Sequence, residues 1–179
     1  MKHYIKLPID FTNVKEEVLA KIQPILDVEN SSNTVTGKDF LLLKDASTVC
    51  DYLSPVMENQ TFDIEAIARY RIHDKMIQPY TLNMSDVFIM PLYNASNCTI
   101  TFYEPSPDVS PHWPTWPVGL VPNHGFYDLA DCTEIESFAF NEPLFVQRNS
   151  VWRIETDDKE NPANILMLLS LTDNTSYFE

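Results

Sequence analysis

The sequence predicts a single, mainly β domain: a double-layer jelly roll with N-terminal helices packed on one of its sheets. Two segments with helical signals come first in a chain of 179 residues. From residue 62 onward the apolar pattern changes to the alternation typical of strands. Only three glycines serve the whole chain, so Asn, Asp and Pro have to form most of the turns between many short strands. Helices followed by a run of strands favour an α+β arrangement in which two packed sheets share one core.

The N-terminal segment, residues 1 to 61, is predicted to be helical. Asn13 followed by Glu16 has the form of a capping box, and apolar residues then recur at helical spacing. A helix is therefore expected over residues 14 to 26. A second helix is expected over residues 47 to 53, because Pro55 pushes the residue before it out of the helical region.

The barrel core is predicted to span residues 62 to 171 within one domain of residues 1 to 179. Residues 62 to 72 alternate apolar and polar side chains, which indicates a strand with one buried face. The apolar run of residues 87 to 93, a polar turn and the alternation of residues 98 to 103 together predict a hairpin. Further strands are expected at residues 132 to 140, 144 to 146, 151 to 155 and 165 to 171.

A long connection rich in proline and tryptophan, residues 105 to 127, interrupts the strands and holds six of the thirteen prolines. Loops of this length are usually functional or disordered. Because prolines and tryptophans are rigid, we expect an ordered flap over the mouth of the sheets. A hydrophobic lid with no ligand beneath it is an equally open interpretation.

Charge and cysteine content restrict the partners and the compartment. The net charge of −14 disfavours binding to nucleic acid or to an anionic membrane, and no apolar stretch is long enough for a membrane span. Cys50, Cys98 and Cys132 fit neither a disulfide framework nor a zinc pattern, which favours reduced thiols and a cytoplasmic protein, in the host cytoplasm if the source is viral. The oligomeric state stays open.

Two sets of residues resemble a known family. The first is Leu82-Asn83, Ile89, Pro91-Leu92, Asn94 and Thr101-Phe102-Tyr103, and the second is Pro143, Phe145 and the segment from residue 161 to 170. Their order resembles that of small iron(II)/2-oxoglutarate-dependent oxygenases of the phage and bacterial hydroxylase kind, over residues 67 to 171. The resemblance implies a double-stranded β-helix, with Fe(II) and 2-oxoglutarate as cofactors of the active enzymes.

The resemblance also implies that this chain has lost its metal ligands. The His-x-Asp positions of the family fall on Gln78 and Tyr80, the distal histidine on Trp152, and the 2-oxoglutarate arginine on Asn164. An indole has no lone pair for a metal, and an amide lacks the guanidinium fork. We therefore expect no cofactor and a non-catalytic protein that binds a small molecule or a protein partner. Its pocket would be lined by Gln78, Tyr80, Asn83, Thr101, Tyr103, Trp152 and Asn164.

Two other functions stay open. The first is an active Fe(II)/2-oxoglutarate hydroxylase with an atypical ligand set from His73, Asp74, His112 or His124. Adjacent residues of a strand point to opposite faces, which disfavours His73 with Asp74. The spacing of His112 and His124 from Asp108, Asp128 and Asp131 matches no standard metal pattern. The second is a viral structural or assembly protein, because jelly rolls also build capsids.

Two arginines are further candidates. Arg148 and Arg153 flank the barrel segment and could bind an anion. In an acidic chain, pairing with Asp or Glu is the alternative use of their charge.

Overall fold

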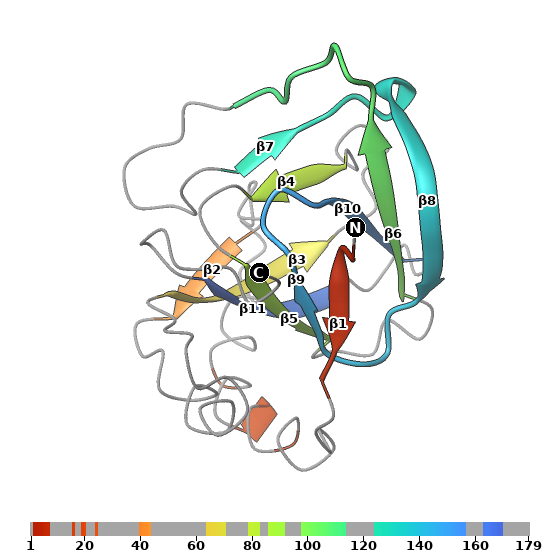
Figure 1. Ribbon diagram of the computed structural model, residues 1–179. Coiled ribbons are helices and arrows are strands. Elements are labelled where there is room, and N and C mark those ends of the chain that lie inside the picture. Colours follow the sequence, from red (N-terminus) through yellow and green to blue (C-terminus); the bar gives the residue numbers. More distant parts are fainter. Residues whose placement is uncertain are drawn as a thin grey trace.

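The computed structural model describes the part of the chain that forms two antiparallel β-sheets (Figure 1). The described residues are 2–7, 16, 19–20, 24, 40–43, 64–70, 79–82, 86–91, 98–113, 124–156 and 163–169. Among them, no helix is long and apolar enough to cross a membrane.

Each sheet is built from strands that are far apart in the sequence. The six-stranded sheet has the order β1 (Tyr4–Lys6), β9 (Leu144–Val146), β5 (Val87–Pro91), β11 (Ala163–Leu169), β3 (Ile64–Tyr70) and β2 (Phe40–Leu43). The five-stranded sheet has the order β7 (His124–Phe126), β4 (Tyr80–Leu82), β10 (Val151–Thr156), β6 (Cys98–Pro105) and β8 (Cys132–Ala139). A 3-10 turn, η1 (Leu129–Asp131), leads directly into β8.

The strand order defines a jelly roll and confirms the predicted fold class. Strands β3, β5, β9 and β11 belong to the six-stranded sheet, whereas β4, β6, β8 and β10 belong to the other. The chain therefore passes from one sheet to the other again and again, so that neighbours in a sheet are seldom neighbours in sequence. Strands β1 and β2 extend the two edges of the first sheet, and β7 extends one edge of the second.

The core lies between the two sheets. Tyr4 of the first sheet stacks on Phe102 of the second, with ring centroids 4.9 Å apart, so the face of the second sheet that carries Phe102 is turned toward the first. Phe102 lies opposite Trp152 in the β6–β10 ladder, and residues directly opposite share a face. Many apolar side chains of the two sheets are buried, with 2% or less of their surface exposed, among them Val87, Phe88, Ile89, Met90, Ile100, Phe102, Leu144, Val146, Trp152 and Ile154.

The predicted hairpin of residues 87 to 93 with residues 98 to 103 is wrong. Both segments are strands, but β5 pairs with β9 and β11, whereas β6 pairs with β8 and β10. The polar residues between them indicate that the chain turns, but a turn does not fix which strand pairs with which. Val87 to Met90 are all buried, which fits a strand that is central in its sheet and covered on both faces.

The other strand predictions are confirmed, with shifts of a few residues at their ends: β3, β8, β9, β10 and β11. Four short strands were not predicted: β1, β2, β4 and β7. Two of these, β1 and β2, lie within residues 1 to 61, so that segment is not wholly helical. The two predicted helices fall almost entirely outside the described residues and stay predictions. The predicted connection of residues 105 to 127 is too long at both ends, because β6 includes Pro105 and β7 begins at His124.

Candidate functional site

The centre of the candidate site is Trp152, and the structure brings it together with Tyr80. Trp152 lies directly opposite Tyr80 of β4 on one side and opposite Phe102 of β6 on the other. The side chain of Trp152 is 1% exposed and is among the largest that are fully buried. Two of the three positions where the resemblance expects metal ligands are therefore cross-strand neighbours in the second sheet.

The described residues around Trp152 do not fit an iron centre. Iron(II) in oxygenases takes imidazole nitrogens and a carboxylate oxygen as ligands. The indole N–H of Trp152 can donate a hydrogen bond but has no lone pair for a metal. The side chains of its neighbours Phe102 and Ile154 have no atom that could bind a metal. Within the residues that the structure describes, no three His, Cys, Asp or Glu side chains lie close enough to hold a metal ion.

The seven residues predicted to line one pocket do not all face the same way. Tyr103 lies opposite Val151, and Thr101 lies opposite Arg153, so both are on the face of the second sheet turned away from Trp152. Asn164 belongs to β11 in the other sheet, where it lies opposite Arg69. Gln78 and Asn83 lie outside the described residues. Thr101 and Tyr103 are therefore turned away from Trp152, because neighbouring residues of a strand alternate between its faces, and the predicted pocket stays a prediction.

The outer face of the second sheet carries a buried polar group. Arg153 forms an ion pair with Glu155, two residues along the same strand, and its side chain is only 14% exposed. The Nε atom of Arg153 and the Oγ1 atom of Thr81 are buried and have no hydrogen-bond partner among the described residues. Beside them, the hydroxyls of Thr101 and Ser137 share a hydrogen bond of 2.9 Å. These are the described polar groups that a small ligand could satisfy on this face.

Arg148 and Arg153 are both near carboxylates. The backbone N–H of Arg148 donates to Oδ1 of Asp86 over 2.8 Å, and Asp86 is 3% exposed. For Arg153, the predicted pairing with an acidic residue is confirmed by Glu155, although in a mostly buried position. The low exposure of Arg153 was not recognisable from the sequence, since it depends on residues outside the strand that cover this side chain.

An apolar cluster covers one end of the same outer face. Tyr103, Tyr127 and Val151 form it, with Val109 and Cys132 packed against them. Burial raises the pKa of Tyr127, and the nearby thiol of Cys132 adds to the effect. Burial also raises the pKa of Cys132, with further contributions from Asp131 and Asp128. Val109, within the predicted flap, therefore packs on the sheet.

The flap residues 111 to 113 cover the β7 edge of the second sheet. His112 forms a β-bridge with Phe126, and each donates its backbone N–H to the other. A Cβ atom on Gly125 would lie 2.8 Å from Cβ of Pro111 and 3.2 Å from the ring of Trp113. Only a glycine allows this close approach, which supports the predicted ordered flap over this part of the chain.

The histidines considered as metal ligands do not assemble a site in the described residues. Nε2 of His112 lies 3.7 Å from Oδ2 of Asp128, and both side chains are more than half exposed. His124 is in β7, where it lies opposite Leu82. His73 and Asp74 lie outside the described residues.

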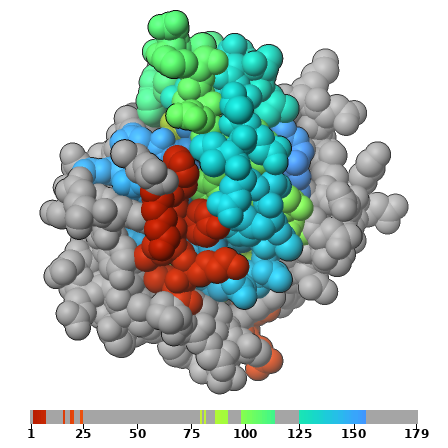
Figure 2. Space-filling model, turned by 45° about the vertical axis from the view of Figure 1, so that its right-hand side comes forward, coloured from red at the N-terminus to blue at the C-terminus, as the bar shows by residue number. Residues whose placement is uncertain are grey.

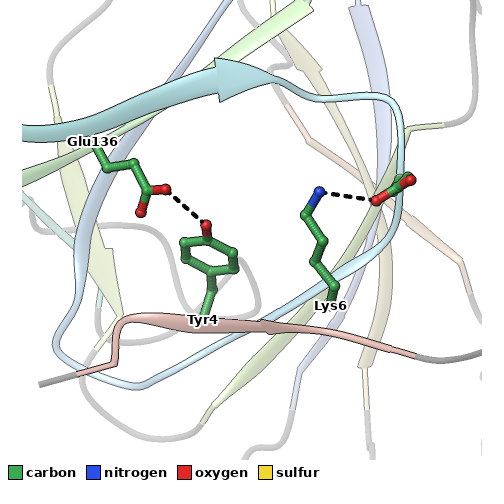
Figure 3. A network of polar contacts seen from close by, with 4 residues as sticks. Tyr4, Lys6 and Glu136 are labelled. Carbon is green, nitrogen blue, oxygen red and sulfur yellow. Dashed lines mark hydrogen bonds and ion pairs between the residues drawn. The ribbon is translucent and has the colours of Figure 1, made fainter.

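Strand β1 makes polar contacts with the β8 side of the second sheet (Figure 3). The hydroxyl of Tyr4 donates to Oε1 of Glu136 over 3.1 Å. Nζ of Lys6 lies 3.0 Å from Oε2 of Glu142 and 5.6 Å from the centre of the Phe138 ring. Sequence analysis missed these residues, because β1 is too short to give a strand pattern.

The thiols agree with the prediction of reduced cysteines where they are described. Cys98 and Cys132 are free, and Cys50 lies outside the described residues. Burial raises the pKa of Cys98 to about 11, so this thiol is protonated at neutral pH and is a poor nucleophile.

Comparisons with known proteins returned distant structural likenesses only. No known protein family matches the sequence, and no curated protein matches it. A solved structure of the non-heme alpha ketoglutarate dependent epimerase SnoN from nogalamycin biosynthesis has 11% identity and a TM-score of 0.49, covering 94% of this chain and 76% of that one. The L-ribose isomerase of Cellulomonas parahominis with L-ribose has 10% identity and a TM-score of 0.38, covering 88% and 82%. The hydroquinone 1,2-dioxygenase PnpCD has 12% identity and a TM-score of 0.28, covering 82% and 96%. With TM-scores below 0.5, these likenesses carry no argument, and the fold rests on the strand order.

Proposed function

We propose that this protein is a non-catalytic, oxygenase-like jelly roll that acts by binding another molecule. The observation that carries the proposal is the position of Trp152. A fully buried indole occupies the inner face of β10, where the resemblance expects a histidine ligand of iron. An indole at this position offers no lone pair that could bind a metal.

The apolar interior also indicates where a ligand would bind. Apolar side chains from both sheets pack between them, and those around Trp152 are exposed by 2% or less. A ligand would therefore meet the outside of the barrel, such as the exposed edge of a sheet. A partner protein fits such surfaces better than a small molecule, which needs a concave pocket.

Metal content tests the proposal directly. The protein is purified without chelators and its iron and manganese are measured by elemental analysis; we expect both to be far below one per chain. Addition of Mn(II) with 2-oxoglutarate should leave the thermal midpoint unchanged, because only a ligand of the native state raises it. Stoichiometric metal, or a rise that requires 2-oxoglutarate, would overturn the proposal in favour of an active hydroxylase with an atypical ligand set.

A pair of variants tests whether Trp152 occupies a former ligand position. Tyr80→His with Trp152→His places two imidazoles on directly opposite residues of β4 and β10. We expect this double variant to gain a rise in midpoint with Mn(II) or Zn(II), whereas Trp152→His alone should gain much less. If the double variant does not fold, elemental analysis of the unchanged protein decides.

A further inference from the structure

The outer edge of β8 is an exposed strand edge in the described part of the chain. Strand β8 ends the five-stranded sheet and pairs only with β6 among the described strands. Most of its residues are exposed, and Figure 2 shows this strand at the surface beside β1. An edge strand presents backbone N–H and C=O groups that can pair with an added strand.

Apolar side chains accompany this edge. Ile135 and Leu129 are each 45% exposed, and they are two of the three large hydrophobic residues exposed in the described part of the chain. Ile135 is skipped in the pairing of β8 with β6, because Phe102 lies opposite Glu136 and Tyr103 lies opposite Glu134. The bulge at this position leaves Ile135 outside the ladder, where it can contact a partner.

The charge around the edge is of one sign. Residues 76 to 147 contain no Lys or Arg and eight Asp or Glu. Glu104, Glu134 and Glu136 are exposed on β6 and β8, and Asp131 precedes β8 directly. Lys6, which lies beside this strand in the described part of the chain, is paired with Glu142 beyond the end of β8. A basic partner would therefore be attracted and an acidic one repelled.

A second copy of this chain is a poor occupant of the same edge. Two β8 strands paired in antiparallel fashion about Ile135 would bring Glu134 of one chain opposite Glu136 of the other. Like charges directly opposite each other destabilise a strand pair, and two chains of net charge −14 repel over a longer range.

We infer that the outer edge of β8 binds an extended, lysine- or arginine-rich segment of another protein, which adds a strand to the five-stranded sheet. Backbone hydrogen bonds would hold the segment, a basic side chain would meet Glu134, which lies opposite Tyr103 on the outer face of the sheet, and an apolar side chain would cover Ile135. The inference rests on the proposed binding role and not on the loss of the metal centre, because this edge is outside the barrel interior.

Peptide binding to the full chain tests the inference. A fluorescein-labelled peptide of alternating lysine and valine is titrated with the protein and followed by fluorescence anisotropy. We expect saturable binding that weakens as salt is raised, since the pairs are exposed. A peptide of alternating glutamate and valine should not bind, and a lysine–valine peptide with alternate backbone amides methylated should bind much more weakly, because it cannot complete the strand pairing.

Matched variants locate the site. Glu134→Gln should weaken binding about two- to fivefold, the range of one exposed ion pair. Glu142→Gln removes the same charge outside this edge and should have little effect. Ile135→Ser should also weaken binding without changing the fold, because this side chain is outside the ladder.

Four results would overturn the inference: no binding of the lysine–valine peptide, equal binding of the methylated peptide, equal losses from the two glutamate variants, or a dimer of the free protein that Glu134→Lys disrupts. The last result would assign the edge to a second copy. If the protein holds no metal and does not bind the peptide, only the inference about the β8 edge is rejected. If the protein binds the peptide but holds stoichiometric metal, only the proposed loss of the metal centre is rejected.

Discussion

Strands β10 and β8 both pair with β6, yet they have opposite environments. In β10, Val151, Trp152 and Ile154 are buried, and even Arg153 is mostly covered. In β8, five consecutive residues from Thr133 to Ser137 are exposed. The difference comes from position in the sheet, since β10 has a strand on either side and the other sheet above it, whereas β8 is an edge. The side chains of β10 are therefore used in packing the core, whereas the edge of β8 is free to bind a partner.

The largest test of this comparison substitutes one residue in each strand. Trp152→Ala should lower the free energy of unfolding by about 3 to 5 kcal/mol, because it leaves a large cavity between the sheets. Ile135→Ala should change it by no more than about 0.5 kcal/mol, because this side chain is nearly half exposed. Urea unfolding of both variants gives the two values. Similar losses for the two would mean that β8 is as much a part of the core as β10.

The contrast between the two strands was only partly accessible from the sequence. The alternation of apolar and polar residues predicted β8 and β10 as strands with nearly the observed ends. It did not indicate that β5 and β6 lie in different sheets, because strand pairing depends on contacts between distant parts of the chain. The strand β4 was also missed, since three residues are too few to establish a period.

The candidate site shows the same limit. Alignment by resemblance chose Tyr80 and Trp152 separately, and the ladder of β4 and β10 makes them direct neighbours. Thr101 and Tyr103 were assigned to the same pocket from the Thr101-Phe102-Tyr103 motif of the resemblance. Strand alternation places them on the other face, and this follows only once the register with β10 is known.

The second prediction compares two thiols, Cys98 on β6 and Cys132 at the start of β8. Burial raises the pKa of Cys98 from 9.0 to about 11, so between these pH values the unfolded thiol ionises while the folded one does not. This contribution to stability is present below pH 9 and is lost as pH rises toward 11, with a slope of up to about 1.4 kcal/mol per pH unit. The free energy of unfolding, measured with urea across this pH range, should therefore fall less steeply with pH in Cys98→Ala than in the unchanged protein. Cys132→Ala should change this pH dependence less, because Cys132 is more exposed than Cys98. A larger change in Cys132→Ala would mean that Cys132 is the more deeply buried thiol.

The third prediction concerns the other edge of the same sheet, at β7, which the flap covers. Gly125→Ala should cost about 1 to 3 kcal/mol, because the added methyl group meets Pro111 and Trp113 at distances that force one of them to move. The double variant Gly125→Ala with Pro111→Gly should recover part of this loss, which a double-mutant cycle measures. Full additivity of the two substitutions would mean that the flap does not pack on β7, and the two edges would then be equally open.

The smallest expected effect measures how firmly β1 holds β8. Tyr4→Phe removes the hydrogen bond to Glu136 but keeps the ring contacts with Phe102 and Phe138. Because the bond is exposed to water, we expect a loss of about 0.5 kcal/mol, at the lower end of the range for hydrogen bonds. Burial, followed by the bond to Glu136 and its negative charge, raises the pKa of Tyr4, so Glu136→Gln should lower the pH at which Tyr4 ionises, as measured by tyrosinate absorbance. A loss of unfolding free energy several times larger in Tyr4→Phe would mean that β1 fixes the position of β8. The first sheet would then hold the β8 edge in place before any partner binds.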